Sequence, residues 1–270
     1  MCSVLEVSRS GYYAWRRRLP CARDLEDQRL LKQVRRLYYD SHEIYGAPRI
    51  HQLLAERGVR VGRKRIARLM RRAGLVAKAK RRFRRKGNYG HQYQAGFHRP
   101  AASALTACHQ VWVADTTLIK VGERYAFLAA VMDLHSRQIV GWRLGHRNGA
   151  NLTGGALQSA IDKHRPATGM VYHSDQGIEY ANYTISAILT RNGYEQSMSR
   201  RGNCYDNAHM ESFFHTLKTE CLHHQTFRSL DELQKALFQY IEAFYNTRRC
   251  HSSLGYLSPK EYATQHDKHR

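Results

Sequence analysis

Two long strand-like runs joined by a four-residue turn constrain the fold of this chain more than any other feature. The runs are 111–120 and 125–133, and Val121-Gly122-Glu123-Arg124 lies between them. A third run, 138–144, follows the short turn at 135–137. Connections of this length join antiparallel neighbours, because parallel strands need a crossover of a dozen residues or more. The pattern therefore predicts a three-stranded antiparallel meander.

Helical and strand-like patterns alternate after the meander. Apolar positions recur at helical spacing in some segments, and short apolar runs lie between those segments. In chain order, helix, strand, helix, strand and helix are expected at 151–163, 170–173, 181–191, 196–199 and about 205–220. This order predicts an α/β fold with a mixed five-stranded sheet and flanking helices, which is the arrangement of ribonuclease-H-like folds.

The front of the chain is expected to be all-α. Three short helices are predicted within 24–74, and the third packs Ile66, Leu69 and Met70 inward beneath a basic outer surface. This is the layout of a helix-turn-helix with a basic recognition helix, and a small bundle with a solvated charged face is the alternative. The expected segments are a helical fragment at 1–23, a helix-turn-helix domain at 24–74, a basic linker at 75–105, the α/β core at 106–225 and a helical extension at 226–270.

Positive charge is concentrated in the front part of the chain. The 270 residues carry 44 Lys and Arg against 22 Asp and Glu, a net charge of +22. Residues 1–105 hold 26 basic and 7 acidic side chains, net +19, whereas 106–270 hold 18 and 15, net +3. Such asymmetry indicates nucleic acid as a partner, although a solvated basic surface is the alternative. The predicted DNA contacts in this part are Lys64, Arg65, Arg68, Arg71, Arg72, Arg81, Arg82, Arg84 and Arg85.

The cysteines and the apolar runs give an expectation for the cellular compartment of the protein. No two of the six cysteines are spaced C-x-x-C, and the chain is too long for a disulfide-stapled mini-domain, so reduced intracellular thiols are expected. No zinc knuckle is evident. The longest apolar run, 126–132, is far too short to span a bilayer, and no signal peptide is found. We therefore expect a soluble, cytoplasmic protein.

Three acids follow or lie on elements of the predicted core. Asp115 follows the apolar run 111–114, Asp175 follows another at 170–173, and Glu211 lies on the last helix. Transfer of a phosphodiester needs charge stabilised on the attacking and leaving oxygens, which two divalent ions roughly 3.5–4 Å apart provide. Magnesium prefers oxygen ligands and keeps several waters, so a few carboxylates are enough to hold it. We predict that these three acids converge as a catalytic and metal-binding site.

Other polar residues near these acids are weaker candidates. Asp133 also ends a strand-like run, but its surroundings are typical of a turn in which Asp caps backbone amides. Asp206 is interpreted as a helix cap and Glu179 as a surface acid. His173 is either a neighbour of the metal or a packed histidine, and the sequence leaves both open.

Three motifs together resemble a known family. They are Trp112-Val113-Ala114-Asp115-Thr116-Thr117, His173-Ser174-Asp175-Gln176-Gly177, and the run from Ser199-Arg200-Arg201-Gly202 to Glu211-Ser212-Phe213-Phe214. They are similar to the DDE catalytic core that retroviral integrases share with transposases of bacterial insertion sequences. Tyr245-Asn246-Thr247-Arg248-Arg249 and Ser8-Arg9-Ser10-Gly11-Tyr12-Tyr13 resemble the end and the start of a second-reading-frame product of such elements.

The resemblance implies a mechanism, a cofactor and partners. It implies that Asp115, Asp175 and Glu211 ligate two Mg²⁺ ions, with Mn²⁺ able to replace them. It further implies cleavage at element ends to free a 3′-hydroxyl, followed by strand transfer to another DNA strand. Expected partners are terminal-repeat and target DNA, a second copy of the chain on paired ends, and a helix-turn-helix partner from an upstream reading frame. The remaining predicted DNA contacts are Arg200, Arg201, Asn207, Lys218, Arg248 and Arg249.

Two other functions fit the same residues. A catalytically silent DNA-binding regulator would occupy element ends without cutting them. A structure-specific nuclease on the same fold would cut DNA but never join it. In a bacterium, the leading interpretation places the protein on the nucleoid.

Overall fold

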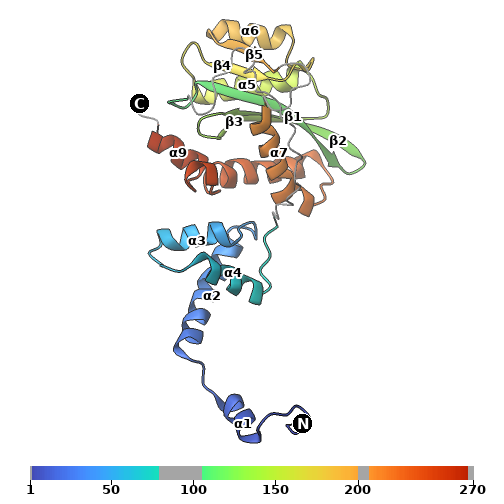
Figure 1. The fold of residues 1–270 in the computed structure, drawn as a ribbon. Coiled ribbons are helices and arrows are strands. Elements are labelled where there is room, and N and C mark those ends of the chain that lie inside the picture. The colour runs from blue at the N-terminus through green and yellow to red at the C-terminus, as the bar shows by residue number, and fades with distance from the viewer. Residues whose placement is uncertain (1, 79–104, 200–206, 267–270) are drawn as a thin grey trace, which may run out of the picture. The chain divides into compact units, whose positions relative to one another are not determined.

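The computed structural model describes residues 2–78, 105–199 and 207–266, which form two compact units divided after Lys78 (Figure 1). Most of the predicted basic linker lies outside the described residues. So do its four predicted DNA contacts, Arg81, Arg82, Arg84 and Arg85, as well as Arg200, Arg201 and Asp206. None of the described helices combines the length and apolarity that a membrane crossing needs. The five cysteines within the described ranges are free thiols.

The N-terminal unit is all-α. Its helices are α1 (Arg9–Arg17), α2 (Ala22–Asp40), α3 (Ala47–Glu56) and α4 (Arg63–Arg72). Ser8 caps α1 by accepting a hydrogen bond from the Gly11 amide. Pro48 lies in the first turn of α3, where a missing N–H costs nothing. Helices α2, α3 and α4 share a buried core that includes Val34, Leu37, Ile50, Leu54, Ile66 and Leu69, whereas α1 buries no residue.

The second unit is built on the predicted mixed sheet. Its strands are β1 (Val111–Val121), β2 (Arg124–Asp133), β3 (Ile139–Gly145), β4 (Val171–Ser174) and β5 (Glu195–Met198), in the spatial order β3-β2-β1-β4-β5. Strands β1, β2 and β3 pair antiparallel, which confirms the meander. Strands β4 and β5 run parallel to β1, because helices cross over between them.

Two helices, α5 (Ala150–His164) and α6 (Tyr183–Asn192), pack on one face of the sheet. Trp112 and Ala114 of β1 join a buried cluster with Leu157 of α5 and Ile185 of α6. Because side chains alternate along a strand, Val113 and Asp115, which neighbour these two residues, point to the opposite face. Helix α7 (Ala208–Glu220) packs against β1 from that opposite face (Figure 1).

The C-terminal segment is a succession of short helical elements. Helix α8 (Leu230–Phe238) continues into a π-helical stretch, η4 (Gln239–Tyr245), before the short η5 (Ser252–Leu254) and α9 (Pro259–His266). In a π-helix, residues five apart lie above one another. The widened turn therefore places Tyr240 and Tyr245 on one buried face, with ring centroids 6.2 Å apart.

Candidate active site

The strand register brings Asp115 and Asp175 to the same level of the sheet. Trp112 of β1 pairs with Tyr172 of β4, and Val113 pairs with His173. Two residues further along, the same register reaches Asp115 on β1 and Asp175 just after β4. Adjacent strands lie about 4.8 Å apart, and residues in register on parallel strands point to the same face. Asp115 lies within β1 rather than at its end, but its parallel pairing with β4 stops just before it. The two carboxylates therefore share the face that α7 covers.

Asp115 is held in an unfavourable electrostatic setting. It is half-buried, and its Oδ1 accepts a hydrogen bond of 2.7 Å from the amide of Thr116. Burial raises its pKa to about 7, and the charges of Asp175, Glu211 and Glu179 act in the same direction, while the Thr116 amide opposes them. Asp175 and Glu211 are near enough for their charges to contribute to this shift of the Asp115 pKa.

Glu211 comes from the first turn of α7. The neighbouring Met210, Phe213 and Phe214 are buried against the core, and Glu211 itself is exposed at the edge of this apolar stripe. Helix periodicity explains both facts, because residues three and four apart share a face and their neighbours do not. The helix thus presents a carboxylate beside the sheet while its apolar side holds it in place.

Asn207 joins the start of α7 to β1 next to Asp115. Its Nδ2 donates a hydrogen bond of 3.0 Å to the carbonyl of Ala114, the residue before Asp115. The side chain is buried, and its Oδ1 has no hydrogen-bond partner among the residues that the structure describes. A buried acceptor without a donor costs about 1–3 kcal/mol, so this oxygen is open to a donor or a cation that the described residues do not supply.

The chemistry of these donors fits a hard divalent cation. Asp115, Asp175, Glu211 and the orphaned Asn207 oxygen are all oxygen donors, which magnesium prefers. Their like charges also oppose one another in the absence of a cation. As the side chains stand, no three His, Cys, Asp or Glu residues within the described ranges lie close enough to hold one ion. Binding of one ion by all three acids would therefore require their side chains to rearrange.

Two of the weaker candidates have structural roles. Asp133 is fully buried and accepts hydrogen bonds from the amides of His109 and Ser136, each 2.8 Å, so the predicted turn role is confirmed. His173 is a packed histidine, because its two ring nitrogens lie 3.0 and 3.1 Å from the hydroxyls of Ser197 and Ser199.

Glu179 is an acid whose place the sequence interpretation missed. It is half-buried, accepts a hydrogen bond of 2.9 Å from Asn148 Nδ2, and helps to raise the pKa of Asp115. It was interpreted as a surface acid because an isolated glutamate in a polar loop carries no pattern. Its position four residues after Asp175 in the same loop was the available signal.

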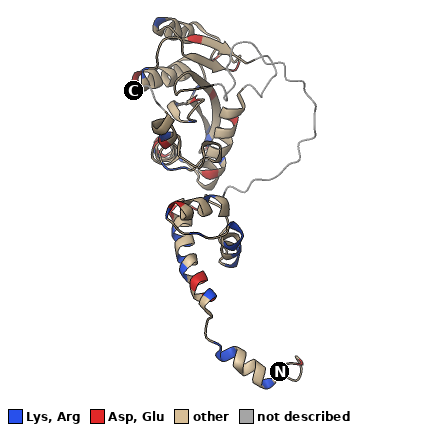
Figure 2. Cartoon of the chain, turned by 60° about the vertical axis from the view of Figure 1, so that its left-hand side comes forward, with Lys and Arg blue, Asp and Glu red and all other residues tan. Residues whose placement is uncertain are grey.

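Two of the basic residues predicted to contact DNA on α4 are engaged within their own unit. Arg65 Nε lies 2.6 Å from Asp27 and its Nη2 3.1 Å from Glu26, while Arg68 Nη2 lies 2.6 Å from Asp27. Asp27 is buried on α2, so these pairs fix α4 against α2. Basic residues lie along the helices of this unit in Figure 2. The other predicted contacts on α4 are exposed: Lys64, Arg71 and Arg72.

The predicted contacts of the second unit fall into different environments. Lys218 is half-buried on α7, two turns after Glu211, and Arg248 is exposed. Arg249, in contrast, is 5% exposed and forms a bidentate ion pair with Glu220, so a DNA phosphate has no access to its guanidinium unless that pair opens. The sequence motif that contains Arg249 gives no information on which of its side chains are buried.

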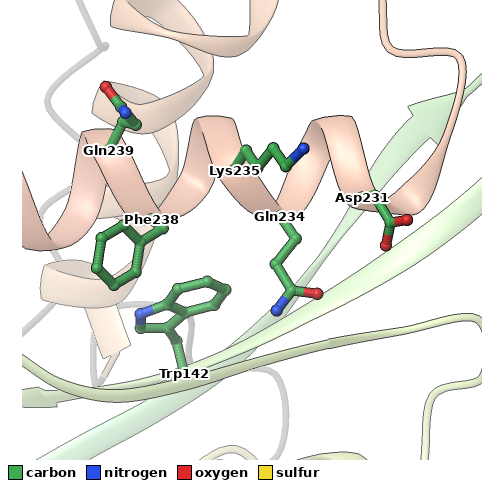
Figure 3. A pocket seen from close by; sticks show the side chains of 6 residues that line it. All are labelled: Trp142, Asp231, Gln234, Lys235, Phe238 and Gln239. Carbon is green, nitrogen blue, oxygen red and sulfur yellow. The ribbon is translucent and has the colours of Figure 1, made fainter.

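A pocket of about 430 Å³ lies apart from the acids, between β3 and α8 (Figure 3). Trp142 and Phe238 face each other across it, and none of the predicted site residues lines it. Asp115 instead lies on the central strand, on the face of the sheet that α7 covers.

Comparison with known proteins identifies the class and then the family. A family described as an integrase core domain matches residues 106–204, a second of the same description matches 192–259, and an HTH-like domain matches 25–83. A chain in the cryo-EM structure of a simian T-cell lymphotropic virus intasome in complex with PP2A regulatory subunit B56 gamma has a similar fold. Its TM-score is 0.52 at 16% identity, covering 86% of this chain and 74% of that one. The fold is therefore that of the ribonuclease-H-like integrase cores.

The relatives in sequence are proteins of insertion elements. An uncharacterized 31 kDa protein of insertion element IS600 from Shigella sonnei is 42% identical over 97% of both chains. Transposase InsF for insertion sequence IS3A from Escherichia coli K12 is 37% identical over 97% of this chain and 92% of its own. The chain belongs to the IS3 family of insertion-sequence transposases. It is thus a DNA-binding protein of the polynucleotidyl transferase kind that acts in DNA transposition.

Proposed function

We propose that this transposase cleaves DNA at the ends of its insertion sequence to free a 3′-hydroxyl and joins that hydroxyl to another DNA strand. Asp115, Asp175 and Glu211 are the catalytic residues of this proposal and the ligands of two Mg²⁺ ions. The observation that carries the proposal is geometric: the register of β1 and β4 leads to Asp115 and Asp175 at the same level, and α7, with Glu211 in its first turn, packs against β1.

Each acid has a distinct means of support. Strand β1 holds the backbone of Asp115, and the Gly177 amide donates a hydrogen bond of 3.0 Å to Asp175 Oδ1. Glu211 enters from the first turn of α7 and has the freedom of an exposed side chain. When bound, divalent ions supply charge stabilisation at the attacking and leaving oxygens. The protein side chains orient the scissile phosphate and fix the geometry of attack.

Substitution of each acid tests the assignment. We expect Asp115→Asn, Asp175→Asn and Glu211→Gln each to reduce Mg²⁺-dependent strand transfer on terminal-repeat DNA by about 1,000-fold or more, while DNA affinity is retained. Glu195→Gln, which removes an exposed acid on β5, is the matched control. Full activity in any of the three variants would refute the role of that residue.

The products of the same assay separate the alternatives. Joined products with labelled ends support the transferase and exclude a nuclease that cuts without joining. Binding without cleavage in Mg²⁺ or Mn²⁺ would instead favour a silent regulator of element ends.

The DNA-binding part of the proposal rests on exposed cations. On α4, Lys64, Arg71 and Arg72 are free of the ion pairs that engage Arg65 and Arg68. A protein that neutralises several phosphates releases counterions, so its affinity falls by decades over a few-fold rise in salt. We expect that steep dependence for the full chain, and a shallower slope for the triple alanine variant at these three positions. A flat salt profile for the wild type would exclude phosphate contact as the role of the basic unit.

Assembly on paired ends completes the proposal. One active site has to act together with a second DNA end, so a homo-oligomer on two terminal repeats is expected, with an upstream-frame helix-turn-helix protein as a further partner. Light scattering of the chain with terminal-repeat DNA, with and without the upstream product, measures this stoichiometry. A strictly monomeric complex on one end would contradict it.

A further inference from the structure

Helix α7 carries a second glutamate, and that residue is buried. Glu220 is the last residue of α7, the helix whose first turn carries Glu211, and its side chain is 1% exposed. Its Oε1 accepts a hydrogen bond of 2.6 Å from Arg249 Nη2, and its Oε2 accepts two of 2.7 Å, from Arg249 Nε and from the hydroxyl of Tyr240. Both oxygens of the carboxylate are therefore satisfied by residues of the C-terminal segment.

The same segment contacts α7 at a second place. The ring of Tyr245 packs edge-on against Phe213 of α7, with centroids 4.9 Å apart. The guanidinium of Arg249 lies 5.7 Å from the centroid of the Tyr245 ring, and its Nη1 is 3.2 Å from His251 Nε2. Phe213 lies two residues from Glu211, so this contact fixes the half of the helix that carries the predicted catalytic acid.

The segment is also attached to the sheet. Asn246 Oδ1 accepts a hydrogen bond of 2.9 Å from the amide of Ile139, and Asn246 Nδ2 donates one of 3.0 Å to the carbonyl of the same residue. Ile139 starts β3, near the point where the pairing of β2 and β3 shifts register. The amide of Lys260 donates to the Asn246 carbonyl at 2.9 Å, which holds the loop from the other side. We name residues 240–251 the C-terminal bracket, because they join α7 to β3.

The energetics of a buried ion pair favour a role in positioning. A buried pair gains little net stability, because desolvation of both charges offsets their attraction, and apolar residues of similar volume often serve as well. Its fork geometry nevertheless permits only one relative placement of the two partners. At its other end, the hydrogen bond from Asn207 to Ala114 attaches the start of α7 to β1, and buried apolar side chains of α7 pack against the core. Apolar packing tolerates small shifts, so the directional contacts of the bracket are expected to set the register of the helix on the sheet.

We propose that the bracket, through Glu220, Arg249 and Tyr245, sets the position of α7 on the sheet and thereby the distance of Glu211 from Asp115. Glu220 and Arg249 are positioning residues in this scheme, and the effect on the reaction rests on the proposed function of Glu211. A misplacement of about 1 Å at a reacting centre can cost 100-fold in rate, so loss of the pair is expected to affect strand transfer far more than DNA affinity.

Arg248 provides a matched control for Arg249. Both substitutions to alanine remove one positive charge at adjacent positions, but Arg248 is exposed whereas Arg249 is buried. We expect Arg249→Ala and Glu220→Gln each to lower strand transfer by about 100-fold and to leave DNA affinity within about twofold of the wild type. Arg248→Ala is expected to act on DNA affinity and its salt dependence instead.

The direction of the change in DNA affinity in Glu220→Gln distinguishes a positioning role of Arg249 from a contact with DNA. If Arg249 bound phosphate, removing a neighbouring acid would free the guanidinium and strengthen DNA binding. A parallel loss of strand transfer in the Glu220 and Arg249 variants supports the bracket. Arg249→Lys keeps the charge without the fork and is expected to restore only part of the activity. Full strand transfer in Arg249→Ala, or DNA affinity that falls as in Arg248→Ala, would overturn the proposal.

Hydrogen exchange tests the bracket without any use of activity. In the full-length Arg249→Ala chain, amides of α7 should exchange faster while those of β2 stay protected, because only the helix loses its attachment. Faster exchange throughout the unit would indicate a general loss of stability and would count against positioning. If the wild type proves inactive, the proposed function fails but this measurement still decides the bracket. Should Arg249→Ala fail to fold, the same comparison is made with Arg249→Lys.

Discussion

Two carboxylates of the same unit lie in opposite settings. Glu220 is buried with three hydrogen bonds from a guanidinium and a phenol, whereas Asp115 receives one backbone amide and lies among three other acids. The charge of Glu220 raises the pKa of Arg249 despite the burial that lowers it, and burial raises the pKa of Asp115 with the help of neighbouring charges. The fold thus supplies partners for both oxygens of the Glu220 carboxylate, whereas it leaves the ionised form of Asp115 destabilised.

The difference separates a structural acid from an acid kept ready for a ligand. A site that must accept cations or phosphates cannot satisfy its acids internally, because the bound group has to supply the missing charge or donor. A residue that holds elements in register needs every partner within the protein. The predictions below test this distinction, from the largest expected effect to the smallest.

Removal of Glu220 should give the largest loss of stability. Glu220→Ala leaves the buried Arg249 guanidinium without a counter-charge, which costs about 3–5 kcal/mol. Chemical denaturation of the second unit measures this change. Asp162→Ala, which removes an exposed acid of α5 that accepts a hydrogen bond from Gln158, is the control and should cost about 0.5 kcal/mol or less.

Removal of the charge of Asp115 should have the opposite sign. The pKa of Asp115 is raised from 3.8 to about 7, which means that the fold destabilises the ionised carboxylate. Because the side chain is partly exposed, this destabilisation amounts to about 2 kcal/mol. We therefore expect Asp115→Asn to raise the free energy of unfolding at pH 8 when divalent cations are removed by chelation. An unchanged or lower value would mean that the acid is not destabilised in the folded protein.

The same pair of proteins predicts a pH dependence. The pKa of Asp115 is higher in the folded protein than in the unfolded chain, so the folded state binds the proton more tightly. The contribution of this carboxyl to stability is therefore greatest below about pH 4, falls as pH rises, and is constant above about pH 7. The difference in unfolding free energy between Asp115→Asn and wild type should grow through this interval and then level off.

In the N-terminal unit, Asp27 behaves as a second example of a satisfied buried acid. Asp27→Asn leaves Arg65 and Arg68 without its charge and should cost about 1–2 kcal/mol. Exchange of α2 and α4 amides in the full chain measures the effect. Equal protection in the variant would show that these pairs do not hold α4 in place.

The smallest effect on stability is expected at the surface of α2, the helix that also carries Asp27. Arg36 and Asp40 form an exposed pair at 3.8 Å, and Arg36→Ala should change stability by about 0.5 kcal/mol or less. A larger loss would show that exposure is not what distinguishes this pair from that of Asp27.

Much of the fold followed from local patterns in the sequence. The turn at 121–124 predicted the antiparallel meander, and apolar periodicity predicted a helix at about 205–220, where α7 is found. These features depend on residues close in sequence, so periodicity and turn chemistry suffice to find them. The π-helical stretch after α8 was missed, because its widened turn depends on aromatic packing with distant residues.

The sequence by itself determined the elements, the basic front of the chain and the identity of the three acids within motifs. Only the tertiary structure decided that Arg249 is buried against Glu220 rather than exposed, that Arg65 and Arg68 are engaged by Asp27, and that Glu179 lies beside Asp115. The physical reason is the same in each case. Whether a charged side chain contacts water, an opposite charge or a like charge depends on residues tens of positions away in the sequence. A local sequence pattern therefore does not predict it.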